Sequence, residues 1–175
     1  MKENNAFLFV GKMPSFKDLL DDVSSIPQEE WVRYRDRKVG IAAEKTDTIP
    51  LIYDNKHRIE SRILHENYKT FSKYLDDVVS NVSPHVGEVK VKQAMLARLK
   101  ANTVILRHMD KGPITAKTHR IHIPVITNTS CIFSVGDECK NLEAGQIWII
   151  DNVNRYHGVE NNGTNDRVHL IVDAI

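Results

Sequence analysis

Seven short runs in the second half of the chain, in which apolar and polar residues tend to alternate, decide the fold. They read GEVKVKQAMLARL (87–99), NTVILRHMD (102–110), HRIHIPVI (119–126), SCIFSV (130–135), GQIWIID (145–151), YHGVEN (156–161) and DRVHLIVDAI (166–175). Alternation with a period of two is typical of β-strands, and the β-branched residues in these runs favour strands. Glycine, asparagine and proline separate the runs as turns, and no helical pattern lies between them. Many short strands at close spacing predict an antiparallel sandwich or a closed barrel.

The residues before this region favour helices. Ser15–Asp18 has the pattern of a capping box, which predicts a helix that runs to about Val23. Pro27 is followed by acidic residues, which is typical of a second helix start. Apolar residues recur at spacings of three to five between Glu60 and Val82, so we expect a longer helix there. A short strand is expected at Thr48–Tyr53.

Length and composition are typical of one compact domain. The patterns described above divide it into an α-rich part over residues 1–87 and a β core over residues 88–175. The 175 residues are 41% hydrophobic and 27% charged, with a net charge of +1. Because no half of the chain is strongly basic, we expect no nucleic-acid partner and no membrane partner. No apolar run approaches the length of a membrane-spanning helix, and no signal peptide is apparent. Cys131 and Cys139 form no disulfide framework, so we expect a cytoplasmic protein. The oligomeric state is left open.

His108 and Asp110 are the first candidate metal ligands. They are two residues apart at the end of the run TVILRHMD, so strict alternation places them on one face of a strand together with Val104 and Leu106. His157 is the natural third ligand, because 47 residues leave room for strands that return it to this place. Two histidines and one carboxylate form the facial set typical of non-haem Fe(II) oxygenases. The alternative is a histidine and an aspartate on the surface at a strand end.

Arg167 lies in a strand that otherwise resembles a buried core strand, where it shares a face with His169 and Ile171. A buried guanidinium is costly without an anionic partner, and a dicarboxylate ligand would supply one. Arg120 and His122 likewise share one face of their strand. Each of these faces either lines the barrel interior or faces solvent at a sheet edge, and the pattern alone leaves both options open.

The motifs together resemble one known family. From about Val89 the order HMD, RIHIPV, GQIWIIDN, HGVENN and DRVHLIVD is similar to the aspartyl/asparaginyl β-hydroxylases. These are Fe(II)- and 2-oxoglutarate-dependent dioxygenases, and they include bacterial hydroxylases of free amino acids such as proline. The resemblance covers about the last half of the chain. It implies a double-stranded β-helix, the jelly-roll, cupin-like barrel that the strand pattern also predicts.

By this resemblance, His108, Asp110 and His157 are expected to be the iron ligands. The peptidyl members of the family lack the carboxylate ligand and carry a second arginine at the position of Thr118. Both departures favour an amino-acid substrate over an acidic peptide. The carboxylate at Asp110 also favours hydroxylation over halogenation, because related halogenases leave that position to a halide.

The resemblance further implies three residues that bind the co-substrate. Arg167 would bind the distal carboxylate of 2-oxoglutarate, and His122 would hold its metal-binding end. Arg120 would bind a carboxylate of either the co-substrate or the substrate. The expected activity is hydroxylation, with O2, of an unactivated C–H bond in an amino acid or amino-acid residue, with release of succinate and CO2. Two alternatives stay open: a cupin-type isomerase or dioxygenase that needs no 2-oxoglutarate, and a non-catalytic barrel that binds a metal or a small acid.

Overall fold

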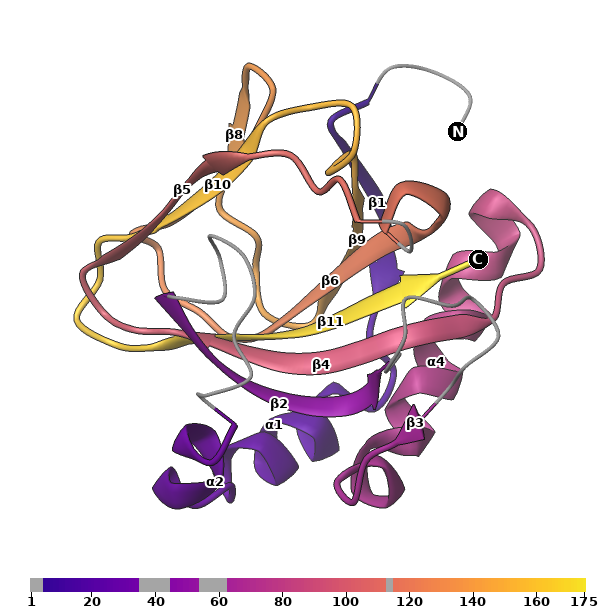
Figure 1. Cartoon of the computed structure of the whole chain (residues 1–175), viewed down its shortest axis with the longest axis vertical. Coiled ribbons are helices and arrows are strands. Elements are labelled where there is room, and N and C mark those ends of the chain that lie inside the picture. The colour runs from indigo at the N-terminus through magenta and orange to yellow at the C-terminus, as the bar shows by residue number, and fades with distance from the viewer. Residues whose placement is uncertain (1–4, 35–44, 54–62, 113–114) are drawn as a thin grey trace.

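Two antiparallel β-sheets enclose the interior of a jelly-roll barrel, as the strand pattern predicts (Figure 1). The computed structural model describes residues 5–34, 45–53, 63–112 and 115–175. Within these residues the major sheet has the order β1-β9-β6-β11-β4-β2-β3 and the minor sheet the order β5-β10-β7-β8. The strands are β1 Phe7–Lys12, β2 Thr46–Tyr53, β3 Ile63–Leu64, β4 Val91–Leu99, β5 Thr103–His108, β6 His119–Ile126, β7 Cys131–Val135, β8 Glu138–Lys140, β9 Gln146–Ile150, β10 His157–Asn161 and β11 Arg167–Ala174.

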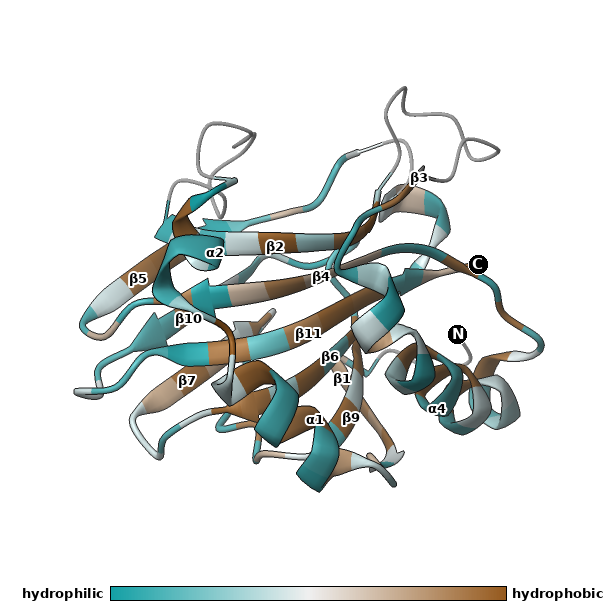
Figure 2. Ribbon diagram, turned by 90° about the horizontal axis from the view of Figure 1, so that it is seen from below, coloured by the Kyte–Doolittle hydropathy of each residue, from teal (hydrophilic) through white to brown (hydrophobic). Residues whose placement is uncertain are grey.

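Helices cover the outer face of the major sheet (Figure 2). They are α1 (Phe16–Ser24), α2 (Gln28–Val32) and α4 (Tyr68–Val86). Helix α1 contacts β6, α2 contacts β2, and α4 contacts both β1 and β2. A short 3₁₀ turn, η2 (Thr115–Lys117), precedes β6. These contacts bury one apolar stripe of each longer helix, so most of the stability of the helices comes from packing on the sheet.

Two details of the helix predictions are wrong. Ser15 directly precedes α1, so the predicted start of this helix is confirmed. Its side chain makes no capping hydrogen bond, because its hydroxyl donates to the Asp77 carboxylate of α4, so the predicted capping box is wrong. The third helix begins at Tyr68, because Ile63–Leu64 pairs with the end of β2 as a strand. Glu60, where this helix was expected to begin, lies outside the described residues.

The alternation of side chains on the major sheet separates the core from the cavity. On β6, Ile121 and Ile123 pack under the helices, whereas Arg120 and His122 point into the barrel. On β11, Leu170 and its alternate neighbours join the same helix-facing core. Strand β6 lies between β9 and β11, so the sheet-edge alternative for its polar face is wrong. The polar residues of these two strands therefore face the interior.

The first 87 residues supply strands as well as helices. Strand β1 pairs with β9, and β2 pairs with β4. The division of the chain at residue 87 stays a prediction, and strands from both of its parts share the major sheet. Among the described residues, no helix is long and apolar enough to cross a membrane.

Candidate metal centre

His108 and His157 are cross-strand neighbours. Strands β5 and β10 are adjacent in the minor sheet, and their register pairs these two residues directly. Their ring centroids lie 4.3 Å apart. The fold thus brings together two residues that are 49 positions apart in the sequence, as the sequence analysis expected.

A β-bulge turns His108 towards the interior. The register pairs His157 with His108 but Val159 with Ile105, so β5 contains one residue more than β10 between these pairs. The extra residue puts His108 and Ile105 on the same face, and both line the interior cavity. Leu106 faces outwards and is 68% exposed. The prediction that Val104, Leu106 and His108 share a face is therefore wrong, because it assumed an unbroken alternation.

Asp110 lies just beyond the end of β5, where two hydrogen bonds to Asn152 hold it. Its backbone N–H donates to the Asn152 carbonyl oxygen (2.9 Å), and the Asn152 side-chain amide donates to Asp110 Oδ2 (2.8 Å). Asn152 is buried in the segment that leads from β9 to β10. This segment ends at His157, so Asn152 connects the carboxylate to the strand that carries the second histidine.

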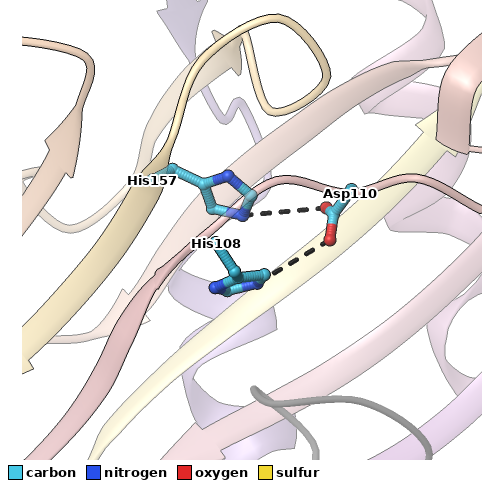
Figure 3. Close-up of side chains that lie close together, drawn as sticks. All are labelled: His108, Asp110 and His157. Carbon is cyan, nitrogen blue, oxygen red and sulfur yellow. Dashed lines mark ion pairs between the residues drawn. The ribbon is translucent and has the colours of Figure 1, made fainter.

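The three side chains point towards one another (Figure 3) and offer ligand atoms that all lie within 4.8 Å of one another. Asp110 Oδ1 lies 3.7 Å from Nε2 of His108, and Asp110 Oδ2 lies 3.7 Å from Nε2 of His157. Nδ1 of His108 lies 2.8 Å from the Leu106 carbonyl oxygen, to which it must donate its proton. That hydrogen bond selects the tautomer whose Nε2 lone pair is available for a metal ion.

The protonation states at this cluster suit metal binding. Burial lowers the pKa of His157 to about 4, so its imidazole is neutral near pH 7. Burial alone would raise the pKa of Asp110, but the guanidinium of Arg120 and the hydrogen bond from Asn152 hold it below its ordinary value. The carboxylate is therefore charged. Neutral imidazole and ionised carboxylate are the forms that bind metal ions.

A cavity of about 580 Å³ opens beside the cluster, and all six residues singled out from the sequence line it. Arg167 is the notable cation in it, because the side chain is only 2% exposed. Among the described residues, no carboxylate forms an ion pair with Arg167, and its buried Nε has no hydrogen-bond partner. Burial lowers the pKa of Arg167 to about 10, which keeps it charged at neutral pH. A partly unsatisfied buried guanidinium is suited to an anionic ligand.

A pair of buried histidines lies beside Arg167. Nδ1 of His169 accepts a hydrogen bond from Nη2 of Arg167 (2.6 Å) and lies 3.2 Å from Nδ1 of His122. Burial lowers the pKa of both histidines well below the ordinary value, and the charge of Arg167 adds to the effect. Arg167 is therefore held by a neutral acceptor, and no carboxylate among the described residues pairs with its charge.

Arg120 differs from Arg167 because it has two carboxylate partners. Its Nε and Nη2 donate to the two oxygens of Asp173 at 2.8 Å each, and Nη1 donates to Asp110 Oδ2. Burial would lower the pKa of Arg120, but Asp173 and Asp110 outweigh that effect and raise it. The role of Arg120 in binding a carboxylate of the co-substrate or substrate stays a prediction.

Two residues of this arrangement were missed in the sequence. Asn152 directly follows Asp151, the last residue of the run GQIWIID. Asp151 orders the turn, since it accepts hydrogen bonds from Asn154 and pairs with Arg155, and Asn152 contacts Asp110. Asp173 has the same parity as Arg167 in β11, and an acidic residue on that inward face was the signal that could have found it.

Comparison with known proteins places the chain in a family. The family model described as aspartyl/asparaginyl beta-hydroxylase matches residues 16–175. A 2-oxoglutarate-Fe(II) oxygenase family oxidoreductase from Burkholderia pseudomallei is 14% identical with a TM-score of 0.61, and the match covers 74% of this chain and 65% of that one. This chain thus spans about two thirds of the length of that relative.

Two prolyl hydroxylases share the fold over nearly the whole chain. The enzyme from Trichoplax adhaerens, in complex with a hypoxia-inducible factor peptide, is 12% identical with a TM-score of 0.61, and the match covers 98% of this chain and 84% of that one. The viral collagen prolyl hydroxylase from Paramecium bursaria Chlorella virus-1, in complex with 2-oxoglutarate, is 7% identical with a TM-score of 0.61, and the match covers 98% and 96%. Likeness at these identities shows the shared jelly-roll fold. The match to the family model over residues 16–175 shows that the chain belongs to the aspartyl/asparaginyl β-hydroxylase family.

Proposed function

We propose that this protein hydroxylates an unactivated C–H bond of an amino acid or amino-acid residue, with Fe(II) as the metal and 2-oxoglutarate and O2 as co-substrates. The observation that carries the proposal is Arg167. It is a buried cation with no carboxylate partner among the described residues, and it lines the same cavity as the two-histidine, one-carboxylate cluster. A metal alone explains the cluster, and an anionic co-substrate would supply the partner that Arg167 lacks among the described residues.

His108, Asp110 and His157 would hold the Fe(II). Their donor set of two imidazoles and one carboxylate fits this metal, and ligation by three groups on one side leaves half of an octahedral coordination sphere open. When bound, Fe(II) and 2-oxoglutarate supply the activation of O2 that cleaves the C–H bond, and the co-substrate leaves as succinate and CO2. The protein contributes geometry, charge and the exclusion of water.

Arg167 would bind the distal carboxylate of 2-oxoglutarate through a charge-assisted pair. His122 lines the same cavity and is kept neutral by burial, and its imidazole would help hold the metal-binding end of the co-substrate. Phe133 packs beside both residues, with its ring 5.1 Å from the His122 ring and 5.7 Å from the Arg167 guanidinium carbon. This apolar ring would exclude water and so strengthen the ion pair between Arg167 and the distal carboxylate of 2-oxoglutarate.

The substrate would enter over β2 and β4, where the cavity wall is formed by small or flexible side chains, namely Thr46, Thr48, Met95 and Ala97. Asp110 and Thr118, the two departures from the peptidyl hydroxylases, support a small amino-acid substrate. The Trichoplax relative carries a peptide in its complex, so peptides belong in the test. Succinate release would be measured with each free amino acid and with short peptides that contain proline, aspartate or asparagine.

One titration separates this function from the two alternatives. Anaerobic Fe(II) protein would be titrated with 2-oxoglutarate, and a charge-transfer band in the visible spectrum is the expected result. The Asp110→Ala variant should lose the band, because it lacks one of the three ligands. A wild-type protein that binds Fe(II) but gives no spectral response would refute the proposal in favour of a cupin-type enzyme or a binding protein. Succinate formation in the presence of O2 separates an enzyme from a binding protein.

A further inference from the structure

Arg120 lines the cavity and bridges the buried carboxylate of Asp173 and the part-buried carboxylate of Asp110. Arg120 and Asp173 are directly paired in the register of β6 and β11, and Asp173 is 1% exposed. The bidentate contact to Asp173 uses Nε and Nη2, and Nη1 turns to Asp110 Oδ2. Three of the five N–H groups of the guanidinium are thus committed to protein carboxylates.

We propose that Arg120, oriented by Asp173, is a positioning residue that holds one oxygen of Asp110 and leaves the other for the metal ion. This inference rests on the proposed function, in which Asp110 is an iron ligand. It gives Arg120 a role different from anion binding, because its N–H groups already bind two carboxylates, whose charges more than offset its own.

The contacts of Asp110 divide its two oxygens. Oδ2 accepts hydrogen bonds from both Arg120 and Asn152. Oδ1 faces Nε2 of His108 at 3.7 Å, as Oδ2 faces Nε2 of His157, but Oδ1 accepts no hydrogen bond from the described residues. With two donors on Oδ2, Oδ1 is the oxygen with free lone pairs, so the carboxylate is prepared to bind through one atom.

Ligation through one oxygen matters for the coordination sphere. Two histidines and a monodentate carboxylate leave three of six octahedral positions open. A carboxylate bound through both oxygens would leave only two, and the chelating pair of 2-oxoglutarate would fill both. The Arg120–Asp173 pair would therefore keep one coordination position of the metal free for O2 when 2-oxoglutarate is bound.

The test uses Co(II) as the probe metal, because its visible spectrum depends on coordination number. In both Asp173→Asn and Arg120→Gln, we expect Co(II) affinity to fall about 10- to 100-fold, the range typical when a residue that orients a metal ligand is replaced. The Co(II) spectrum should also change, and the affinity of the Co(II) protein for 2-oxoglutarate should stay close to that of the wild type. The effects should be less than additive in the double variant, since both residues act on the same oxygen.

Two reference variants make the result interpretable. Asp110→Ala should weaken Co(II) binding at least as much as either variant; if it does not, the proposed function itself fails. Asp47→Asn removes another buried carboxylate that is paired with an arginine, Arg98 (2.8 Å), and it should leave Co(II) affinity unchanged. If Asp110→Ala weakens binding but Asp173→Asn and Arg120→Gln leave Co(II) affinity and spectrum unchanged while 2-oxoglutarate or substrate binds more weakly, Arg120 is an anion-binding residue and the inference is overturned. Should Arg120→Gln fail to fold, Arg120→Lys replaces it, with the same expected loss because lysine lacks the planar fork.

Discussion

Replacing Arg167 by methionine is the most direct test of the co-substrate pocket. Methionine keeps much of the side-chain length and removes the charge and all donors. The buried guanidinium has one hydrogen bond to His169 and no carboxylate partner among the described residues, and its Nε is unpaired. Loss of one partner of a buried, hydrogen-bonded charge pair costs about 2–5 kcal/mol of binding free energy. The Kd for 2-oxoglutarate should therefore rise about 30-fold to several thousand-fold.

The same substitution should leave the ligand-free protein intact. Replacement of a buried charge by an apolar side chain of similar volume is often neutral or stabilising, and the lost hydrogen bond to His169 costs only about 1 kcal/mol. Arg98→Met is the matched control, because Arg98 is also buried but is paired with Asp47. It should destabilise the protein by about 3 kcal/mol, the low end of the usual range. Lys100, whose Nζ lies 3.5 Å from Asp47, offsets part of that loss.

Thermal unfolding with and without 2-oxoglutarate measures both effects. Under anaerobic conditions with Fe(II), a ligand at 100 times its Kd stabilises the wild type by about 2.7 kcal/mol. For a chain of this length that is a rise in Tm of about 5–11 °C. The rise should fall to about a third or less of its wild-type value in Arg167→Met at the same concentration and persist in Arg98→Met. An undiminished rise in Arg167→Met, or a large loss of stability before ligand is added, would refute the reasoning.

Three further outcomes are expected. Asp110→Ala should abolish succinate formation, and full activity in that variant would contradict its role as a ligand. Gly158→Ala should cost about 1–3 kcal/mol in denaturant unfolding, because a Cβ there would lie 2.9 Å from the Ile105 carbonyl oxygen of β5; an unchanged stability would show that β5 yields freely. Burial holds the pKa of His122 and His169 well below 6.5, so only the unfolded chain takes up these protons as the pH falls below 6.5. The free energy of unfolding should then fall by about 1.4 kcal/mol per pH unit for each histidine. His169→Asn should remove the contribution of one histidine from that slope. An equal slope in both proteins would contradict the assignment.

The interior faces of β6 and β11 were predictable from the sequence because those strands alternate without interruption where the key residues lie. His122 and Arg167 could be assigned to one side of the sheet by counting in twos. What counting could not decide was whether that side faced solvent or the interior. The answer depends on β6 and β11 lying inside the sheet, which is a matter of long-range strand order.

Position 108 shows where counting fails. His108 and Leu106 have the same parity, yet one lines the cavity and the other faces outwards. The bulge in β5 that separates them arises from pairing with β10, which lies about 50 residues later in the sequence. The local sequence pattern does not indicate it. The helix that begins at Tyr68 was misplaced for a related reason, since Ile63–Leu64 fits a helical stripe as well as a strand and the partner, β2, decides between them.

The two arginines of the cavity are best understood through the partners that the sheet gives them. Arg120 lies opposite Asp173 in the register, whereas Arg167 lies opposite Leu99. Two arginines and two carboxylates, Asp110 being the second, sum to zero charge when the buried histidines are neutral. Fe(II) and the 2-oxoglutarate dianion also sum to zero, so this set of two arginines and two carboxylates stays balanced when both are present under the proposed function. Either one alone would leave two uncompensated charges in a buried site, where such charges are costly. Arg167, which has no carboxylate partner among the described residues, is therefore part of the same charge balance as Arg120, and a carboxylate opposite Arg167 would destroy that balance.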